Sequence, residues 1–194
     1  EVSLTFYRQA SAATLTRWRD VVPDDFAFTF KASRTITHDK KLIDCGAELE
    51  AFVHGLDPMG PRVASLLFQL PPSLTVEPDR LSAFLETAST VFDSMATHPL
   101  PAIEFRHPSW YSPRTFALLR RYGWSVVVHD MMKAGGWNVV GESLEAGASR
   151  WSFDEFLGLD GPSLYLRFHG PTGRYRGDYG ERKLKRWALL ASSA

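Results

Sequence analysis

The sequence contains a single cysteine, Cys45, so no disulfide bond can form within the chain. No apolar run approaches the ~20 residues that a membrane-spanning helix needs, and no signal peptide is visible. These absences are typical of a reducing compartment, and we predict a cytoplasmic protein that does not bind membranes. The chain begins at Glu1 within an apparent strand, which indicates part of a longer natural chain.

An excess of either charge is also absent, because 22 Lys and Arg residues balance 22 Asp and Glu residues. Any attraction for nucleic acid or another polyanion must therefore come from a local patch. No glycine-rich phosphate motif follows a predicted strand, which argues against dinucleotide binding. No linker or low-complexity stretch divides the 194 residues, so we predict a single domain over residues 1–194.

Six apolar segments have the pattern of β-strands, and helical stripes separate them. The predicted strands cover residues 2–7, 26–31, 63–70, 103–106, 124–128 and 164–168. Five helices are predicted. The first begins after Ser11, the second and third cover residues 49–56 and 81–88, and the fourth begins with the Ser112 cap and Pro113. The last lies near the end of the chain, with Leu184, Trp187 and Ala188 on one face. Residues 33–41 are predicted as a polar loop, and a short helix is predicted at 153–157. Alternating Phe26, Phe28 and Phe30 are predicted to lie in the core.

Alternation of apolar strands with helices predicts an α/β fold with a parallel sheet that helices cover. A doubly wound open sheet and a closed (β/α)8 barrel both fit this order. Polar residues end nearly every predicted strand, which favours the barrel, because all of its strands lead to one rim. Six strands are two short of a closed barrel.

Several short motifs resemble, in their order, those of the DUF72 family, whose members are also called YecE-like proteins. The resemblance extends from residue 1 to about residue 188. The motifs are Thr5–Arg8, Phe30–Ala32, Ile36–His38, Leu67–Pro72, Glu104–Trp110, Arg167–Pro171, Gly173–Gly177 and Tyr179. The resemblance implies a TIM-type barrel whose first and last strands this chain lacks, and it implies no particular reaction.

In a barrel, the polar residues at the strand ends would gather at one rim. The predicted substrate-binding residues are Tyr7, Arg8, Lys31, Gln69, Arg106, Asp130, Arg167, Tyr175 and Arg176. With Arg34 and Arg174, the rim would hold seven cations against the three carboxylates of Glu1, Glu104 and Asp130. Guanidinium groups bind phosphate and carboxylate in pairs of hydrogen bonds, so this surplus predicts a small anionic ligand.

Glu104, His107 and His169 are the predicted catalytic residues. Glu104 would act as a general acid or base on a rigid strand, and the histidines titrate near neutrality. The alternative for Glu104 is a structural pair with an arginine, and for each histidine a hydrogen bond within the rim. Alternation along the strand places Glu104 and Arg106 on one face and Phe105 beneath the helices.

Three functions remain open from the sequence. The first is an enzyme, a hydrolase or lyase, acting on a phosphorylated or otherwise anionic substrate. The second is a nucleic-acid-binding barrel, with or without cleavage, suggested by the run Arg174–Tyr175–Arg176. The third is a scaffold without catalysis. A divalent metal held by Glu, His and Asp side chains is not favoured, because no closely spaced ligand pair is present, and no other cofactor is assigned.

Overall fold

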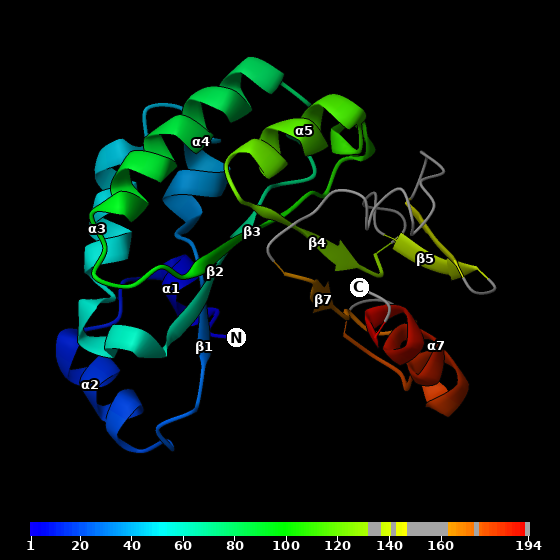
Figure 1. The fold of residues 1–194 in the computed structure, drawn as a ribbon, viewed down its shortest axis with the longest axis horizontal. Helices are drawn as coiled ribbons and strands as arrows, with labels where there is room; N and C mark the ends of the chain where they lie inside the picture. Colours follow the sequence, from blue (N-terminus) through cyan, green and yellow to red (C-terminus); the bar gives the residue numbers. More distant parts are fainter. Residues whose placement is uncertain (132–136, 141–142, 147–162, 173–174, 193–194) are drawn as a thin grey trace. The chain divides into compact units, whose positions relative to one another are not determined.

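The computed structural model describes residues 1–131, 137–140, 143–146, 163–172 and 175–192 (Figure 1). It divides into two compact units, the first made of Glu1–Leu70 and Glu77–Ile103, and the second of Pro71–Val76 and Glu104–Ala194. Both contain parallel strands and helices, which confirms the α/β class. The predicted helix at 153–157 and Arg174 lie outside the described residues, and the single domain stays a prediction.

The first unit is built around β1 (Phe28–Lys31), β2 (Val63–Gln69) and β3 (Leu100–Glu104), which are neighbours in that order. β1 pairs with β2 in parallel, with Phe30 opposite Leu66. The ring of Phe68 on β2 contacts Phe52 and Phe84 at centroid distances of 6.4 and 5.6 Å. Its helical segments are α1 (Leu4–Tyr7), α2 (Ala12–Asp20), η1 (Thr35–Asp39), α3 (Gly46–His54), η2 (Asp57–Arg62) and α4 (Pro78–Asp93).

The predicted strand at residues 2–7 is wrong, because Leu4–Tyr7 forms one helical turn. Val2 alone makes a bridge to β1, where its N–H donates to the carbonyl of Thr29 at 2.7 Å. The Thr5 hydroxyl donates to the carbonyl of Lys31 at 2.7 Å. A side-chain hydrogen bond therefore joins this segment to β1, in place of the backbone hydrogen bonds of a paired strand. Residues 35–39 likewise form a π-helical turn within the predicted loop.

The three phenylalanines before β2 differ in burial, although the sequence predicts all of them in the core. Phe30 is fully buried, whereas 47% of Phe26 is exposed. The rings form a ladder, with centroids 4.9 Å apart for Phe26 and Phe28 and 5.9 Å apart for Phe28 and Phe30. The core prediction is thus right for Phe30 and wrong for Phe26, because strand β1 begins only at Phe28.

The second unit contains two parallel strands, β4 (Ser125–His129) and β7 (Tyr165–Arg167), with His129 opposite Arg167. Its other elements are η3 (Pro108–Trp110), α5 (Pro113–Arg121), β5 (Trp137–Val140), β6 (Ser143–Ala146) and α7 (Gly180–Ser192). β5 and β6 pair in antiparallel orientation, and the sequence patterns predicted neither strand. All five residues of β4 are buried, as expected of a strand covered on both faces.

Local signals determine the helices of this unit. The Ser112 hydroxyl accepts the Thr115 N–H at 3.2 Å and caps α5, Pro113 opens it, and Gly123 follows it with φ +69°. α7 buries Trp187 against Phe168 at a centroid distance of 5.2 Å, but Leu184, predicted on the same face, is 46% exposed. No helix in the described part of the chain is long and apolar enough to cross a lipid bilayer.

Candidate functional site

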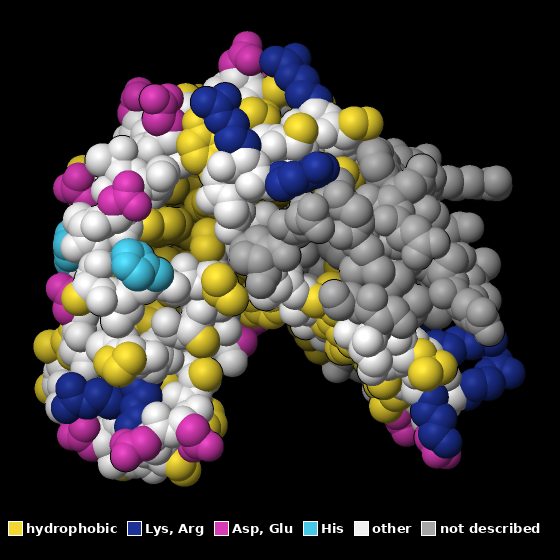
Figure 2. Space-filling view, viewed as in Figure 1, with side chains coloured by type: hydrophobic (Ala, Val, Ile, Leu, Met, Phe, Trp, Pro, Cys, Tyr) yellow, Lys and Arg dark blue, Asp and Glu magenta, His cyan; other side chains and the backbone are white. Residues whose placement is uncertain are grey.

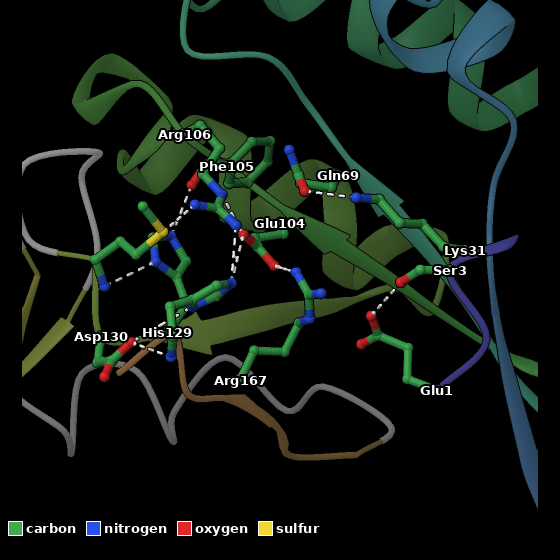
Figure 3. Close-up of polar contacts among 12 residues, drawn as sticks. Glu1, Ser3, Lys31, Gln69, Glu104, Phe105, Arg106, His129, Asp130 and Arg167 are labelled. Atoms are coloured by element: carbon green, nitrogen blue, oxygen red, sulfur yellow. Dashed lines mark hydrogen bonds and ion pairs between the residues drawn. The ribbon is translucent and has the colours of Figure 1, made fainter. Parts of the chain in front are cut away.

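Five charged or polar side chains of the second unit come together beyond the carboxyl ends of β4 and β7 (Figure 3). We call Glu104, Arg106, Asp130, Arg167 and His169 the Glu104 cluster. Arg167 ends β7, and Asp130 follows β4 directly. Because the two strands are parallel and in register, Asp130 and the residues after Arg167 lie at the same edge.

Glu104 lies between two arginines. One carboxylate oxygen, Oε1, forms an ion pair with Arg106 Nε, and the other, Oε2, accepts a hydrogen bond from Arg167 Nη1. Glu104 is fully buried, and both arginine side chains are at most 13% exposed. Burial raises the pKa of Glu104, but the charges of Arg106 and Arg167 outweigh it and hold the pKa below its usual value. Glu104 is therefore ionised at neutral pH.

Arg106 also contacts His169, and this contact determines which ring nitrogen carries the proton. Arg106 Nη2 lies 2.9 Å from His169 Nε2, while its Nη1 donates to the sulfur of Met131. A guanidinium only donates, so Nε2 accepts and the proton lies on Nδ1. Nδ1 faces Asp130 Oδ1 at 3.4 Å. Burial and the nearby arginines lower the pKa of His169, so the ring is neutral.

Asp130 orients His169 through several contacts. Its Oδ1 accepts the backbone N–H of His169 at 2.8 Å, and its Oδ2 accepts the Tyr179 hydroxyl. The Tyr179 oxygen in turn accepts the N–H of Gly170 at 2.6 Å. Burial and the bond to Asp130 raise the pKa of Tyr179 to about 12, so the phenol stays protonated and keeps donating. Gly170 has φ +92°, and a Cβ there would lie 2.5 Å from the backbone nitrogen of Arg176.

His129 has a structural position beneath the cluster. It is fully buried, its Nε2 donates to the carbonyl of Phe105 at 2.8 Å, and its Nδ1 accepts the N–H of Met131 at 3.3 Å. Burial lowers the pKa of His129 to about 4, which leaves the ring neutral. Met131 and Tyr179 were not among the predicted site residues, although Tyr179 belongs to a motif that supports the family resemblance.

Two further residues of the Glu104–Trp110 motif, His107 and Trp110, serve the local fold. His107 Nδ1 accepts the backbone N–H of Ser109 at 3.2 Å and caps the turn η3. The Trp110 ring is fully buried, stacks on Phe105 at 4.9 Å and donates its Nε1–H to the carbonyl of Leu74 at 2.8 Å. The prediction that Phe105 packs inside the fold is confirmed, because the residue is fully buried. A catalytic role for His107 stays a prediction.

The remaining predicted site residues are distributed over both units. In the first unit, Lys31 Nζ donates to Gln69 Oε1 at 2.8 Å and lies 4.2 Å from the centre of the Phe6 ring. Tyr7 and Arg8 are exposed in the first unit, and Tyr175 and Arg176 are exposed in the second. A site that joins Lys31 and Gln69 to the Glu104 cluster stays a prediction.

The chemistry that the Glu104 cluster can perform follows from its groups. Two guanidiniums can bind an oxyanion, the neutral imidazole can accept a proton, and the carboxylate keeps the arginines in place. Glu104 Oε1 and Arg106 Nε form their ion pair without hydrogen-bond geometry, so neither has a hydrogen-bond partner among the described residues. Within the same described residues, no three His, Cys, Asp or Glu side chains are grouped to hold a metal ion.

Known proteins of one family share both the sequence and the fold of this chain. The profile of the family described as "Protein of unknown function DUF72" matches residues 1–193. The chain belongs to this family. It is 30% identical over 112 residues to the UPF0759 protein YecE of Escherichia coli (strain K12), covering 58% of this chain and 39% of that protein. It is 29% identical over 145 residues to the UPF0759 protein YunF of Bacillus subtilis (strain 168), covering 70% and 50%.

Solved DUF72 structures share the fold. A DUF72 family protein from Thermotoga maritima matches 98% of this chain with 25% identity and a TM-score of 0.73, over 70% of its own chain. One from Enterococcus faecalis matches 97% with 17% identity and a TM-score of 0.70, over 74% of its chain. These likenesses support a TIM-like α/β fold. The chain spans between about two fifths and half of the length of the curated relatives.

Proposed function

We propose that this DUF72 chain is part of an enzyme that acts on a small phosphorylated or carboxylated substrate at the Glu104 cluster. The observation that carries the proposal is a buried, ionised Glu104 between Arg106 and Arg167, next to a neutral His169. Buried ion pairs contribute little net stability compared with apolar residues of the same size. Two arginines held at strand ends beside a proton acceptor are more readily explained by catalysis than by stability alone.

In this proposal Arg106 and Arg167 bind the anionic group of the substrate. Glu104 holds the guanidiniums in place, and its lowered pKa suits a base rather than an acid near neutral pH. His169 takes the proton at Nε2, because Asp130 faces Nδ1 and favours that tautomer. Asp130 is then a positioning residue, a narrower role than the substrate binding that the sequence predicts.

Arg106 couples binding to proton transfer in this scheme. In the free protein its Nη2 hydrogen bond occupies the lone pair of His169 Nε2. An anion that draws the guanidinium away frees that lone pair, so the base becomes available when substrate is bound. Removal of charge from Arg106 would therefore weaken binding and also unmask His169.

We further propose that the longer protein closes the TIM-type barrel with strands that this chain lacks. The support is the parallel strand order in each unit and the likeness to DUF72 structures that exceed this chain in length. A closed barrel would bring Lys31 and Gln69 to the same rim as Glu104 and add a cation to the anion site.

Anion binding can be measured first as stabilisation by inorganic phosphate. A ligand at one hundred times its dissociation constant stabilises by about 2.7 kcal/mol, which corresponds to a rise in Tm of about 5–11 °C for a chain of this size. We expect this rise in the wild type and its loss in Arg167→Met. The matched control is Arg121→Met, which replaces an exposed arginine at the end of α5 and should retain the rise in Tm.

Catalysis is then tested with a panel of phosphorylated and carboxylated small molecules. We expect turnover of at least one compound, with loss of activity in His169→Gln while phosphate stabilisation is retained. Phosphate stabilisation without turnover of any compound would favour a binding scaffold. A Tm that phosphate leaves unchanged in the wild type would refute the anion site.

A further inference from the structure

Helix α7 presents a cationic face that the Glu104 cluster does not use. Arg182, Lys185, Arg186 and Leu189 follow the i, i+3, i+4, i+7 spacing of one helical face, and all four are exposed. Figure 2 shows Lys and Arg side chains gathered over α7. The opposite side of the helix buries Trp187. We call these four residues the α7 face.

Few carboxylates offset this charge. Glu181 pairs with Lys185 at 2.6 Å, and both side chains are more than 70% exposed. Within the described residues, Arg182 and Arg186 form no ion pair. The other nearby carboxylate, Asp178, accepts the N–H of Gly180 at 3.0 Å before the helix begins. The face thus keeps a local positive charge in a chain whose formal net charge is zero.

The segment that leads into α7 exposes an aromatic ring by means of an uncommon backbone conformation. Tyr175 has φ +60°, which is unfavourable for a residue with a side chain. Its N–H donates to the carbonyl of His169 at 2.8 Å, and the carbonyl of Arg176 accepts the Thr172 hydroxyl at 2.9 Å. These bonds hold the turn, yet 77% of Tyr175 is exposed and Arg176 is exposed beside it. A strained turn that places a large ring in solvent is a feature that ligand stacking would explain.

We propose that the α7 face, together with Tyr175 and Arg176, binds single-stranded nucleic acid. Clustered cations contact the phosphate backbone, and an exposed aromatic ring stacks on a base. An anionic membrane fits less well, because a surface-bound helix inserts an apolar face, whereas the α7 face has Leu189 among three cations. The cations of the α7 face lie outside the Glu104 cluster, so this proposal does not require the proposed enzymatic function, although the Tyr175 ring lies 5.6 Å from the His169 ring.

The test measures binding of the whole chain to fluorescent oligothymidine and oligouridine at several salt concentrations. We expect affinity to fall linearly with log salt. The variant R182A/K185A/R186A should reduce the magnitude of that slope by about 2, because each lost single-strand phosphate contact removes roughly 0.7. The matched control R114A/R120A/R121A removes three exposed arginines of α5 and should leave the slope unchanged.

Stacking is tested with Tyr175→Asn, because asparagine tolerates positive φ and so retains the turn. We expect affinity to fall on the order of tenfold at constant slope. Circular dichroism confirms that each variant is folded. Equal effects of the α5 and α7 variants, no salt-dependent binding of either oligonucleotide, or tighter binding to phosphatidylserine vesicles than to both oligonucleotides would each overturn the proposal.

Discussion

Replacing Glu104 by Gln should destabilise the second unit strongly, although the side chain keeps its size. The change removes the negative charge that lies between Arg106 and Arg167, so each guanidinium loses its ion pair with Glu104. Removing one partner of a buried ion pair costs about 3–5 kcal/mol. At about 2–4 °C per kcal/mol for a chain of this size, Tm should fall by roughly 6–20 °C. Circular dichroism and tryptophan fluorescence during heating measure this shift.

The effect of Glu104→Gln should depend on pH. The pKa of Glu104 is lowered in the folded state, so its ion pairs contribute stability that is complete above the unfolded value of about 4.3. That contribution is lost as pH falls through the lower folded pKa. The stability difference between wild type and variant should therefore be constant near neutral pH and shrink in acid.

Two further variants make this prediction refutable. Glu181→Gln removes an exposed carboxylate from α7 and should leave Tm unchanged within error. Glu104→Gln combined with Arg167→Met should destabilise by less than the sum of the single changes, because it removes one of the two guanidiniums that lose their ion pair with Glu104. If Glu104→Gln has the same Tm as the wild type, the carboxylate does not hold the two arginines and the site as described is wrong.

Three other changes test the surroundings of the Glu104 cluster. Wild-type stability should fall by about 3 kcal/mol as pH drops from 6.5 towards 4, because His129 binds a proton in the unfolded state but stays neutral when buried in the folded state. Urea titrations of His129→Gln should lack this part of the pH dependence. Gly170→Ala should destabilise by at least 1 kcal/mol more than Gly123→Ala, since both glycines have positive φ but a Cβ at position 170 would meet backbone atoms at 2.5 and 2.6 Å; equal Tm values would contradict this. Tyr179→Phe should cost about 1–3 kcal/mol, because the Gly170 N–H and Asp130 Oδ2 each lose the hydrogen bond to the hydroxyl, and an unchanged urea midpoint would show that water replaces the hydroxyl.

Local patterns predict much of the fold. The apolar run at 63–70, the buried strand at 124–128 and the proline-led cap at Ser112 each correspond to an observed element. Such patterns work because strand burial and helix capping depend on residues within a few positions. The strand prediction for residues 2–7 is wrong because it, too, depends only on residues within a few positions. Its alternation is real, but the chain forms a helical turn there, and the Thr5 hydroxyl bonds the carbonyl of Lys31, which is distant in sequence.

The candidate site is predicted in its parts and not in its contacts. The sequence indicates that Glu104, Arg106, Arg167 and His169 stand at strand ends. It leaves open whether Glu104 binds one arginine or two, and whether His169 accepts or donates. His129 also has the pattern of a rim residue, yet it is buried with both ring nitrogens bonded.

The sequence by itself determines the α/β class, the family and the residue types at the strand ends, because composition, periodicity and ordered motifs are properties of the linear chain. The tertiary structure alone decides the partners within the Glu104 cluster. Glu104 and Arg167 are 63 residues apart, and so are Arg106 and His169. β4 and β7 must pair in parallel to bring the carboxyl ends of both strands to one edge of the sheet. Burial then removes the water that would otherwise solvate these charges, and their pKa values follow from that environment.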